Sequence, residues 1–341
     1  MSRYPIRFGL FLATLAAVVL PAHISRSLPV PAVAEVNAPA AEPSRATGVE
    51  TYAITLGKDP ADVYMPAAPD VHQATTPLPI ALMLPGALVD RSQYSQFASI
   101  VAQYGFAVVV PTHVRTLPEF GLTGELAETA QVPDALTYLS AENERSDSPL
   151  FGKLDLTQLA LLGHSHGGFV GLQAIASTCV YPFCTAPFTR PEAVVAGVFY
   201  GVNTQNPTTG QFGPTANAGI PVALIQGSLD SIATPQEAEA TYTLIETPPK
   251  ALITIAGTNH YGLANENNPV GARPDSNQPT LDQAQGIEAI ANWTGYFLRA
   301  HVLDDKTALS KIYGNTSGDG MATIQSQPSV DTPVAPAASP Q

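Results

Sequence analysis

The segment Gly163-His164-Ser165-His166-Gly167 follows directly after an apolar run, Leu159 to Leu162. A G-x-S-x-G pentapeptide at a strand end is typical of a nucleophile elbow, a sharp strand-to-helix turn that exposes a serine hydroxyl. Glycines two residues on either side of the serine remove side chains that would collide in so tight a turn. The stretch Phe169 to Ser177 is rich in Ala, Leu and Ile and can form the helix that such a turn requires. The pattern predicts Ser165 as a catalytic nucleophile.

Two polar residues downstream are candidates to activate this serine. A hydroxyl is a weak nucleophile near neutral pH, so it needs a base, and the base needs an orienting group. Asp230 comes just after the strand-like run Pro221 to Gln226, and His260 comes shortly after the apolar run Ala251 to Ile255. Taken separately, the three residues also fit a capping serine, a turn-forming aspartate and a structural histidine. Their order and their shared placement at strand ends favour a Ser-Asp-His triad.

Acyl transfer also requires backbone donors for the oxyanion of the tetrahedral intermediate. One donor is expected to be the N–H of His166, the residue after the nucleophile. The other is expected in the loop Leu84-Pro85-Gly86-Ala87-Leu88, which follows an early apolar run. We assign it to the N–H of Ala87, with Leu88 as the alternative one residue further on. An ordinary Pro-Gly turn would account for the same residues.

Apolar runs of strand length alternate with stretches of helical periodicity along most of the chain. This alternation predicts an α/β fold with a mostly parallel central sheet and helices on both faces. Stripes such as Tyr94, Phe97, Val101 and Tyr104 are expected to be core. The expected strands are Thr51–Leu56, Ile80–Leu84, Phe106–Pro111, Gln158–Gly163, Ala193–Tyr200, Pro221–Gln226 and Lys250–Ile255.

The N-terminal region has the layout of a cleavable secretory signal, which we place at residues 1–34. Arg3 and Arg7 precede the apolar stretch Phe8 to Leu20, and an A-x-A site ends at Ala34. An uncleaved N-terminal anchor is the alternative, although the apolar stretch is short for a membrane span. The protein is therefore expected to be secreted or periplasmic, without a stable membrane span after cleavage.

Composition divides the rest of the chain into three parts. Residues 35–48 are rich in Pro and Ala and are expected to be a linker. Residues 49–304 carry the periodic pattern and are expected to be the catalytic domain. Residues 305–341 are expected to be a largely disordered tail, because their end is rich in Pro, Ala and Ser without periodicity.

Cys179 and Cys184 are the two cysteines of the chain. In an exported protein this close pair predicts a local disulfide, with two free buried thiols as the alternative. The pattern does not predict a metal site, because no C-x-x-C or Cys/His cluster accompanies the pair. His164 and His166 are not expected to form a metal pair, since side chains on either side of an elbow diverge. No dinucleotide fingerprint or P-loop is present, so no cofactor is expected.

The formal net charge of the chain is −13 at pH 7. So acidic a protein repels phosphate backbones and anionic membrane surfaces. The sequence contains no basic patch or aromatic RNA-binding motif. Nucleic acid is therefore not an expected partner.

Together these segments resemble the α/β-hydrolase superfamily, in particular dienelactone-hydrolase-like esterases, chlorophyllase-like enzymes and the bacterial cutinases that act on polyesters. The resemblance implies an α/β-hydrolase fold with Ser165, Asp230 and His260 as its triad and Ala87 and His166 as its oxyanion donors. It runs to about Leu303 and is carried by Asp62–Pro66, the Leu84-Pro85-Gly86 loop, Tyr104–Pro111, the elbow, Asp230–Ala233 and Asn259-His260.

Three features set this chain apart from lidded lipases and polyester cutinases. Ala87 stands where those cutinases carry an aromatic residue, and the only tryptophan, Trp293, lies in the last predicted helix. Where lidded lipases insert a helical cap, this chain has only a Gly-, Asn- and Thr-rich stretch, Gly201 to Gly219. No large lid is therefore expected, and Tyr200 and Tyr261 are expected to line an open pocket and bind substrate.

The resemblance and the residues together predict an exported serine hydrolase that cleaves carboxylic esters through an acyl-enzyme. The expected substrate is a small-molecule or polymeric ester. Thioesterase, peptidase, acyltransferase and polyester hydrolase chemistry on the same triad remain alternatives. So does an exported binding protein that keeps the fold without catalysis.

Overall fold

The computed structural model describes residues 42–67, 77–206, 209–314 and 320–329. The predicted secretory signal, residues 1–34, and residues 35–41 of the predicted linker lie outside these ranges. Residues 42–48 of the linker contain no helix or strand, and the Ala46 N–H donates to the Gln103 carbonyl at 2.8 Å. In the described residues, no helix is long and apolar enough to cross a membrane.

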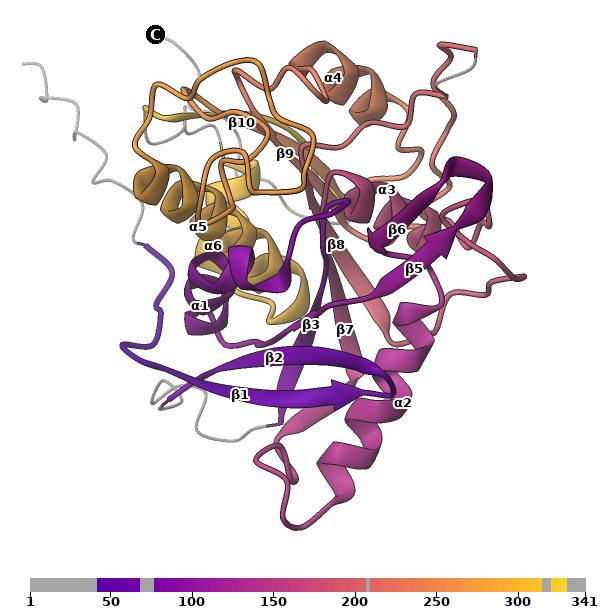
Figure 1. Ribbon diagram of the computed structural model, residues 1–341. Coiled ribbons are helices and arrows are strands. Elements are labelled where there is room, and N and C mark those ends of the chain that lie inside the picture. The colour runs from indigo at the N-terminus through magenta and orange to yellow at the C-terminus, as the bar shows by residue number, and fades with distance from the viewer. Residues whose placement is uncertain (1–41, 68–76, 207–208, 315–319, 330–341) are drawn as a thin grey trace, which may run out of the picture. The chain divides into compact units, whose positions relative to one another are not determined.

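A nine-stranded sheet in the order β1-β2-β4-β3-β7-β8-β9-β10-β11 forms the centre of the fold (Figure 1). The strands from β4 to β10 in this order run parallel, while β1, β2 and β11 join the two edges antiparallel. The predicted α/β-hydrolase fold with a mostly parallel sheet is confirmed. The strands are β1 (Val49–Leu56), β2 (Asp59–Pro66), β3 (Leu78–Leu84), β4 (Ala107–Pro111), β7 (Leu154–His164), β8 (Val194–Tyr200), β9 (Val222–Gly227), β10 (Lys250–Ile255) and β11 (Ala322–Gln327).

Helices cover both faces of this sheet, as predicted (Figure 1). One face is covered by α1 (Ser95–Gln103), α5 (Gln283–Val302) and α6 (Lys306–Tyr313). The other is covered by α2 (Gln131–Glu144), α3 (His166–Ile175) and α4 (Pro235–Thr243). Each face therefore has its own hydrophobic core, and the inner strands are buried between the two.

Strand β7 shows how the sequence divides between these cores. Successive side chains of a strand point to opposite faces of the sheet. Accordingly Leu159 and Leu161 pack in the core with α2 and α3, whereas Ala160 and Leu162 pack in the core with α1 and α5. A strand buried on both faces needs an unbroken apolar run, which is what precedes the elbow.

The predicted helical stripe Tyr94, Phe97, Val101 and Tyr104 is buried, none of its members being more than 3% exposed. It packs in the same core as α5, so its assignment to the core is confirmed.

The seven predicted strands are present, but the sequence did not indicate β2. Pro60 and Pro66 lie at the two ends of that strand, where the missing N–H of proline does least harm to the ladder. The sequence also did not indicate the small separate hairpin of β5 (Val114–Leu117) and β6 (Leu122–Glu125). This hairpin is inserted between β4 and α2, and its tip is the short 3-10 turn Pro118–Phe120.

The prediction of a largely disordered segment over residues 305–341 is wrong for residues 306–313 and 322–327, which form α6 and β11. Helix α6 is capped by Asp305 and buries Ala308 and Ile312, an i,i+4 pair that the average composition of the tail conceals. Strand β11 gains its order by pairing antiparallel with β10. Residues 315–319 and 330–341 lie outside the described residues.

The carboxyl ends of β3, β7, β9 and β10 lie at one edge of the sheet, because these strands run parallel. The loops that follow them are the oxyanion loop (residues 85–90), the elbow, the acid loop (residues 228–234) and the histidine loop (residues 256–282). The connection from β8 to β9 contains no helix in its described residues, 201–206 and 209–221. The predicted site residues are thus carried by loops at this edge.

Candidate active site

Ser165 lies at the tip of the elbow, between the last residue of β7 and the first residue of α3. Its φ of 51° and ψ of −117° are unfavourable for a residue with a side chain. A Cβ on Gly163 would lie 2.7 Å from the Gly167 carbonyl oxygen, and one on Gly167 would lie 2.0 Å from the Leu84 carbonyl oxygen. Both glycines of the motif are therefore required by the close packing of the turn.

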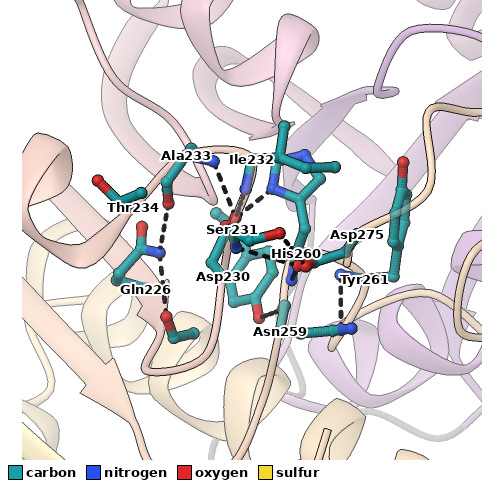
Figure 2. Close-up of polar contacts among 12 residues, drawn as sticks. Gln226, Asp230, Ser231, Ile232, Ala233, Thr234, Asn259, His260, Tyr261 and Asp275 are labelled. Carbon is teal, nitrogen blue, oxygen red and sulfur yellow. Dashed lines mark hydrogen bonds and ion pairs between the residues drawn. The ribbon is translucent and has the colours of Figure 1, made fainter. Parts of the chain in front are cut away.

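Asp230 and His260 are in direct contact (Figure 2). Asp230 is 2% exposed and His260 is 1% exposed, and the Asp230 Oδ2 lies 2.8 Å from the His260 Nδ1. The other oxygen, Oδ1, accepts the N–H groups of Ile232 and Ala233, both at 2.8 Å. Because a carboxylate only accepts, Nδ1 carries the ring proton and Nε2 keeps its lone pair. The acid loop thus holds His260 in the tautomer that a general base needs.

Ser165 and this pair lie on either side of the Tyr200–Gly201 peptide. The Ser165 N–H donates to the Tyr200 carbonyl at 2.9 Å. A Cβ on Gly201 would lie 3.0 Å from the His260 Nδ1 and 3.1 Å from the Asp230 Oδ2. Among the described residues, no hydrogen bond joins the Ser165 hydroxyl to the His260 ring. Contacts between a nucleophile and its base often tighten only in the complex with substrate.

The oxyanion loop packs against the elbow, and two of its N–H groups at residues 86–88 are already hydrogen-bonded. Gly86 donates its N–H to the Tyr94 hydroxyl at 2.8 Å, and Leu88 donates its N–H to the Glu125 carbonyl at 2.8 Å. The alternative assignment to Leu88 is thereby contradicted. The Ala87 N–H between them has no partner within the described ranges. The His166 N–H is the first of α3, where helical N–H groups have no partner inside the helix.

His164, one residue before Ser165, is fully buried, and its role was not predicted. Its Nδ1 lies 3.0 Å from the Tyr94 hydroxyl, and its Nε2 lies 2.9 Å from the His260 carbonyl oxygen. Burial, with a smaller contribution from the neighbouring His260, holds the pKa of His164 well below its usual value. His164 therefore acts here as a neutral hydrogen-bonding group between loops.

Asp275, in the histidine loop, is a second buried carboxylate that the sequence analysis did not identify (Figure 2). It accepts hydrogen bonds from the His260 N–H at 2.9 Å, from the Asn277 N–H at 2.8 Å, and from both the hydroxyl and the N–H of Ser231. Burial by itself would raise the pKa of Asp275, but these hydrogen bonds outweigh it and lower the pKa. The local sequence signals only a polar turn.

The structure buries Tyr200 and Tyr261, which were expected to line an open pocket and bind substrate. Both are 3% exposed. The Tyr200 hydroxyl donates to the Asn259 carbonyl at 2.5 Å, and the Tyr261 hydroxyl donates to the Arg273 carbonyl. Burial raises the pKa of Tyr261 to about 12, so the hydroxyl stays protonated as a donor. Both rings serve as supports for the histidine loop.

The predicted disulfide between Cys179 and Cys184 is confirmed. The loop that it closes follows α3 and packs against the elbow helix. The Phe183 ring centroid lies 4.4 Å from that of Phe169 and 5.0 Å from that of His166. The disulfide therefore holds a loop that lies next to His166, the residue after Ser165.

Two exposed aromatic rings pair this loop with the β5–β6 hairpin. Phe120, at the tip of the β5–β6 hairpin, is 60% exposed and stacks on Tyr181, which is 55% exposed, with centroids 6.5 Å apart. We call these two residues the aromatic rim. The hairpin reaches the oxyanion loop, since Leu88 donates to Glu125 and its side chain occupies the space above Gly124.

The base of the hairpin is held by charged groups around His113. The His113 Nδ1 lies 2.5 Å from the Asp59 Oδ2, and its Nε2 lies 3.1 Å from the Glu128 Oε1. Arg115 contacts the other oxygen of Glu128 at 3.5 Å. Burial by itself would lower the pKa of His113, but the two carboxylates outweigh it and raise the pKa. In the part of the chain that is described, no group of three or more His, Cys, Asp or Glu residues is suited to hold a metal ion.

The sheet, its helices and the elbow have the arrangement of the α/β-hydrolase fold. Within that class, residues 54–181 match the model of the Chlorophyllase family, and the resemblance to chlorophyllase-like enzymes is confirmed. This similarity indicates an esterase-type hydrolase. The matched region contains Ala87 and Ser165 and ends before Asp230 and His260. No curated protein matches the chain.

Proposed function

We propose that this protein is an exported serine hydrolase that cleaves carboxylic esters, with Ser165, His260 and Asp230 as its triad. The observation that carries the proposal is the buried contact between Asp230 and His260, beside a strained serine at a nucleophile elbow. The similarity to the Chlorophyllase family supports an ester as substrate. A cofactor is not needed for this reaction.

Each half of the reaction passes one proton through His260. The Nε2 of His260 accepts the Ser165 proton as Oγ bonds to the ester carbonyl carbon, and the carbonyl electrons move to the oxygen. The N–H groups of Ala87 and His166 bind this oxyanion. The carbonyl re-forms as the C–O bond to the alcohol breaks, and the alcohol leaves with the proton from His260. Water then repeats these steps on the acyl-enzyme and releases the carboxylic acid.

The aromatic rim suggests which part of the substrate is recognised outside the triad. Phe120 and Tyr181 are large apolar rings that remain exposed, on segments that contact the oxyanion loop and the elbow helix. Apolar area removed from water contributes about 25 cal/mol per Å². We propose that the rim contacts an apolar chain of the ester, in a small molecule or a polymer.

Export is supported by the disulfide between Cys179 and Cys184, because disulfides persist in oxidising compartments. Expression of the full chain in a bacterium tests it, with the N-terminus of the protein identified by mass spectrometry in the cytoplasmic, periplasmic and extracellular fractions. We expect the protein that is recovered outside the cytoplasm to lack about its first 34 residues. An intact chain confined to the cytoplasm would contradict export.

The Ser165→Ala variant tests the enzyme assignment. It is expected to lose nearly all hydrolysis of nitrophenyl butyrate and to resist labelling by a fluorophosphonate, while the wild type is labelled on Ser165. Ser310→Ala, an exposed helical serine, is the matched control and should behave as the wild type. More than a tenth of the wild-type rate in Ser165→Ala would refute the assignment.

Failure of the wild type to react with the fluorophosphonate would instead favour a binding protein. Parallel assays with thioesters, anilides and polyester films compare the other acyl-transfer chemistries with ester hydrolysis. The proposal expects the highest kcat/KM with an oxygen ester.

A further inference from the structure

The backbone of His260 is held on both sides by buried side chains that do not belong to the triad. Its N–H donates to the Asp275 Oδ2 at 2.9 Å, and its carbonyl oxygen accepts from the His164 Nε2 at 2.9 Å. We propose that Asp275 and His164 are positioning residues that clamp the backbone of His260 on both sides of its Cα and so aim the imidazole at Ser165. The inference rests on the proposed function of the triad.

Asp275 ties the histidine loop to the acid loop (Figure 2). The carboxylate that accepts the His260 N–H also accepts the hydroxyl and the N–H of Ser231, the residue that follows Asp230. Asp275 is itself held in place, because its N–H donates to the Asn268 side chain at 2.8 Å. One carboxylate therefore sets the distance between the backbones that carry the acid and the base of the triad.

His164 ties the histidine loop to the elbow and the oxyanion loop. The Gly86 N–H donates to the Tyr94 oxygen, so the Tyr94 hydroxyl is free to donate to the His164 Nδ1. The His164 Nε2–H then donates to the His260 carbonyl, which only accepts. Each donor in this series has one acceptor, which fixes His164 as the neutral Nε2–H tautomer. The series connects the oxyanion loop to the catalytic base through the residue beside the nucleophile.

Such a clamp is needed because the histidine loop has no helix or strand of its own over residues 256–282. Loops without secondary structure are more mobile than the elements that they connect. A misplacement of about 1 Å in a catalytic group can cost about 100-fold in rate. Buried hydrogen bonds to the two peptides that flank the His260 Cα restrict the movement of this residue more than a single bond does.

The test compares Asp275→Asn and Tyr94→Phe with the wild type. Asp275→Asn keeps the shape of the side chain and loses the charge and part of its accepting capacity. Tyr94→Phe keeps the ring and removes the hydroxyl that orients His164. Each is expected to lower kcat for nitrophenyl butyrate about 10-fold to 100-fold with KM changed less than about twofold, measured well below the melting temperature.

Asn217→Ala, which removes a buried polar network in the β8–β9 connection, is the control. It should lower the melting temperature and leave kcat unchanged.

A structural role alone would not alter the contact between His260 and Asp230. The proton resonance of the His260 Nδ1–H, identified by its loss in His260→Ala, is therefore a second measurement. It is expected to shift or broaden in both clamp variants and to stay unchanged in Asn217→Ala. The double variant is expected to lose about as much kcat as the worse single variant, since both contacts position the same residue, His260.

Three results would overturn the clamp: unchanged kcat in both single variants, an unchanged Nδ1–H resonance, or independent effects that multiply in the double variant. Failure of the proposed function has a different signature, namely a wild type that neither hydrolyses esters nor reacts with the fluorophosphonate. The resonance still tests the clamp in that case, because it does not depend on turnover.

Discussion

The histidine loop and the aromatic rim come from different parts of the chain, and they are built in opposite ways. The histidine loop has no regular secondary structure, yet Asn259, His260 and Asp275 are each at most 2% exposed and hydrogen-bonded. The rim is carried by a regular hairpin and a disulfide-closed loop, yet its rings are more than half exposed.

This difference shows that regular secondary structure does not decide which segment is fixed. Buried polar side chains without a partner cost about 1 to 3 kcal/mol each, so a satisfied network restricts an irregular loop to one arrangement. Exposed rings carry no such restriction and adapt to what they contact. The polar loop suits a proton transfer of fixed geometry, and the rim suits apolar chains of different length.

The largest expected effect comes from a change in the polar groups that hold His260. In Asp230→Asn an amide N–H faces the His260 Nδ1, so the ring proton moves to Nε2 and the base can no longer accept the Ser165 proton. We expect kcat to fall about 10⁴-fold with the fold intact, as judged by circular dichroism. Asp134→Asn, an exposed position on α2, is the matched control. Activity near that of the wild type in Asp230→Asn would mean that another acid orients His260.

The sequence was sufficient for those parts of the site that short segments specify. Ser165, Asp230 and His260 each follow an apolar strand closely, and parallel strands bring such positions to one edge of the sheet. Cys179 and Cys184 are close enough in the chain for their disulfide to be predicted. The structure describes where Ser165, Asp230 and His260 lie, while their catalytic roles stay predictions for the experiments above.

The remaining features depend on contacts between distant segments. Asp275 contacts Ser231, 44 residues away, and His260, 15 residues away, and no local pattern marks such a return of the chain. The burial of Tyr200 and Tyr261 was not predicted, because a tyrosine suits the wall of an open pocket as well as a core in which its hydroxyl has a carbonyl partner. The clamp around His260 was therefore not accessible from the sequence.

Removal of the disulfide tests whether the loop that carries Tyr181 contributes to stability without affecting turnover. The Cys179→Ala/Cys184→Ala variant frees a loop whose ends are five residues apart, which is worth about 2 kcal/mol of unfolding free energy. Urea denaturation measures this loss, with reduced wild type as the control. We expect kcat on nitrophenyl acetate to stay within about twofold, because the polar network does not involve this loop. A loss of kcat comparable to that of Asp275→Asn would show that this loop, like the histidine loop, fixes the geometry needed for turnover.

Substitution of the rim should change substrate preference rather than chemistry. In Phe120→Ser/Tyr181→Ser we expect kcat/KM to fall about tenfold on nitrophenyl dodecanoate, equivalent to about 1.4 kcal/mol, and to stay unchanged on nitrophenyl acetate. Phe151→Ser, at an equally exposed ring in the connection between α2 and β7, is the control and should leave both values unchanged. Equal losses on the short and the long ester would exclude recognition of an apolar chain.

The smallest expected effect is a difference in pH dependence between the stability contributed by the histidine loop and that contributed by the base of the hairpin. The pKa of Asp275 is lowered by its hydrogen bonds, against burial, so its contribution to stability is complete above its unfolded pKa near 3.8 and is lost as the pH falls through the folded value. The pKa of His113, at the base of the hairpin, is raised by Glu128 and Asp59, against burial. Its contribution is complete below 6.5 and is lost as the pH rises through the folded value.

Urea unfolding of Asp275→Asn and His113→Gln across pH 3 to 9 measures both contributions against the wild type. The deficit of Asp275→Asn should begin to shrink as the pH falls below 3.8, because proton uptake by the unfolded wild type then removes part of the stability that the carboxylate contributes. The deficit of His113→Gln should shrink in the opposite direction, above pH 6.5. Parallel pH dependence in the two variants would show that the histidine loop and the hairpin base are not stabilised by charges of opposite kind.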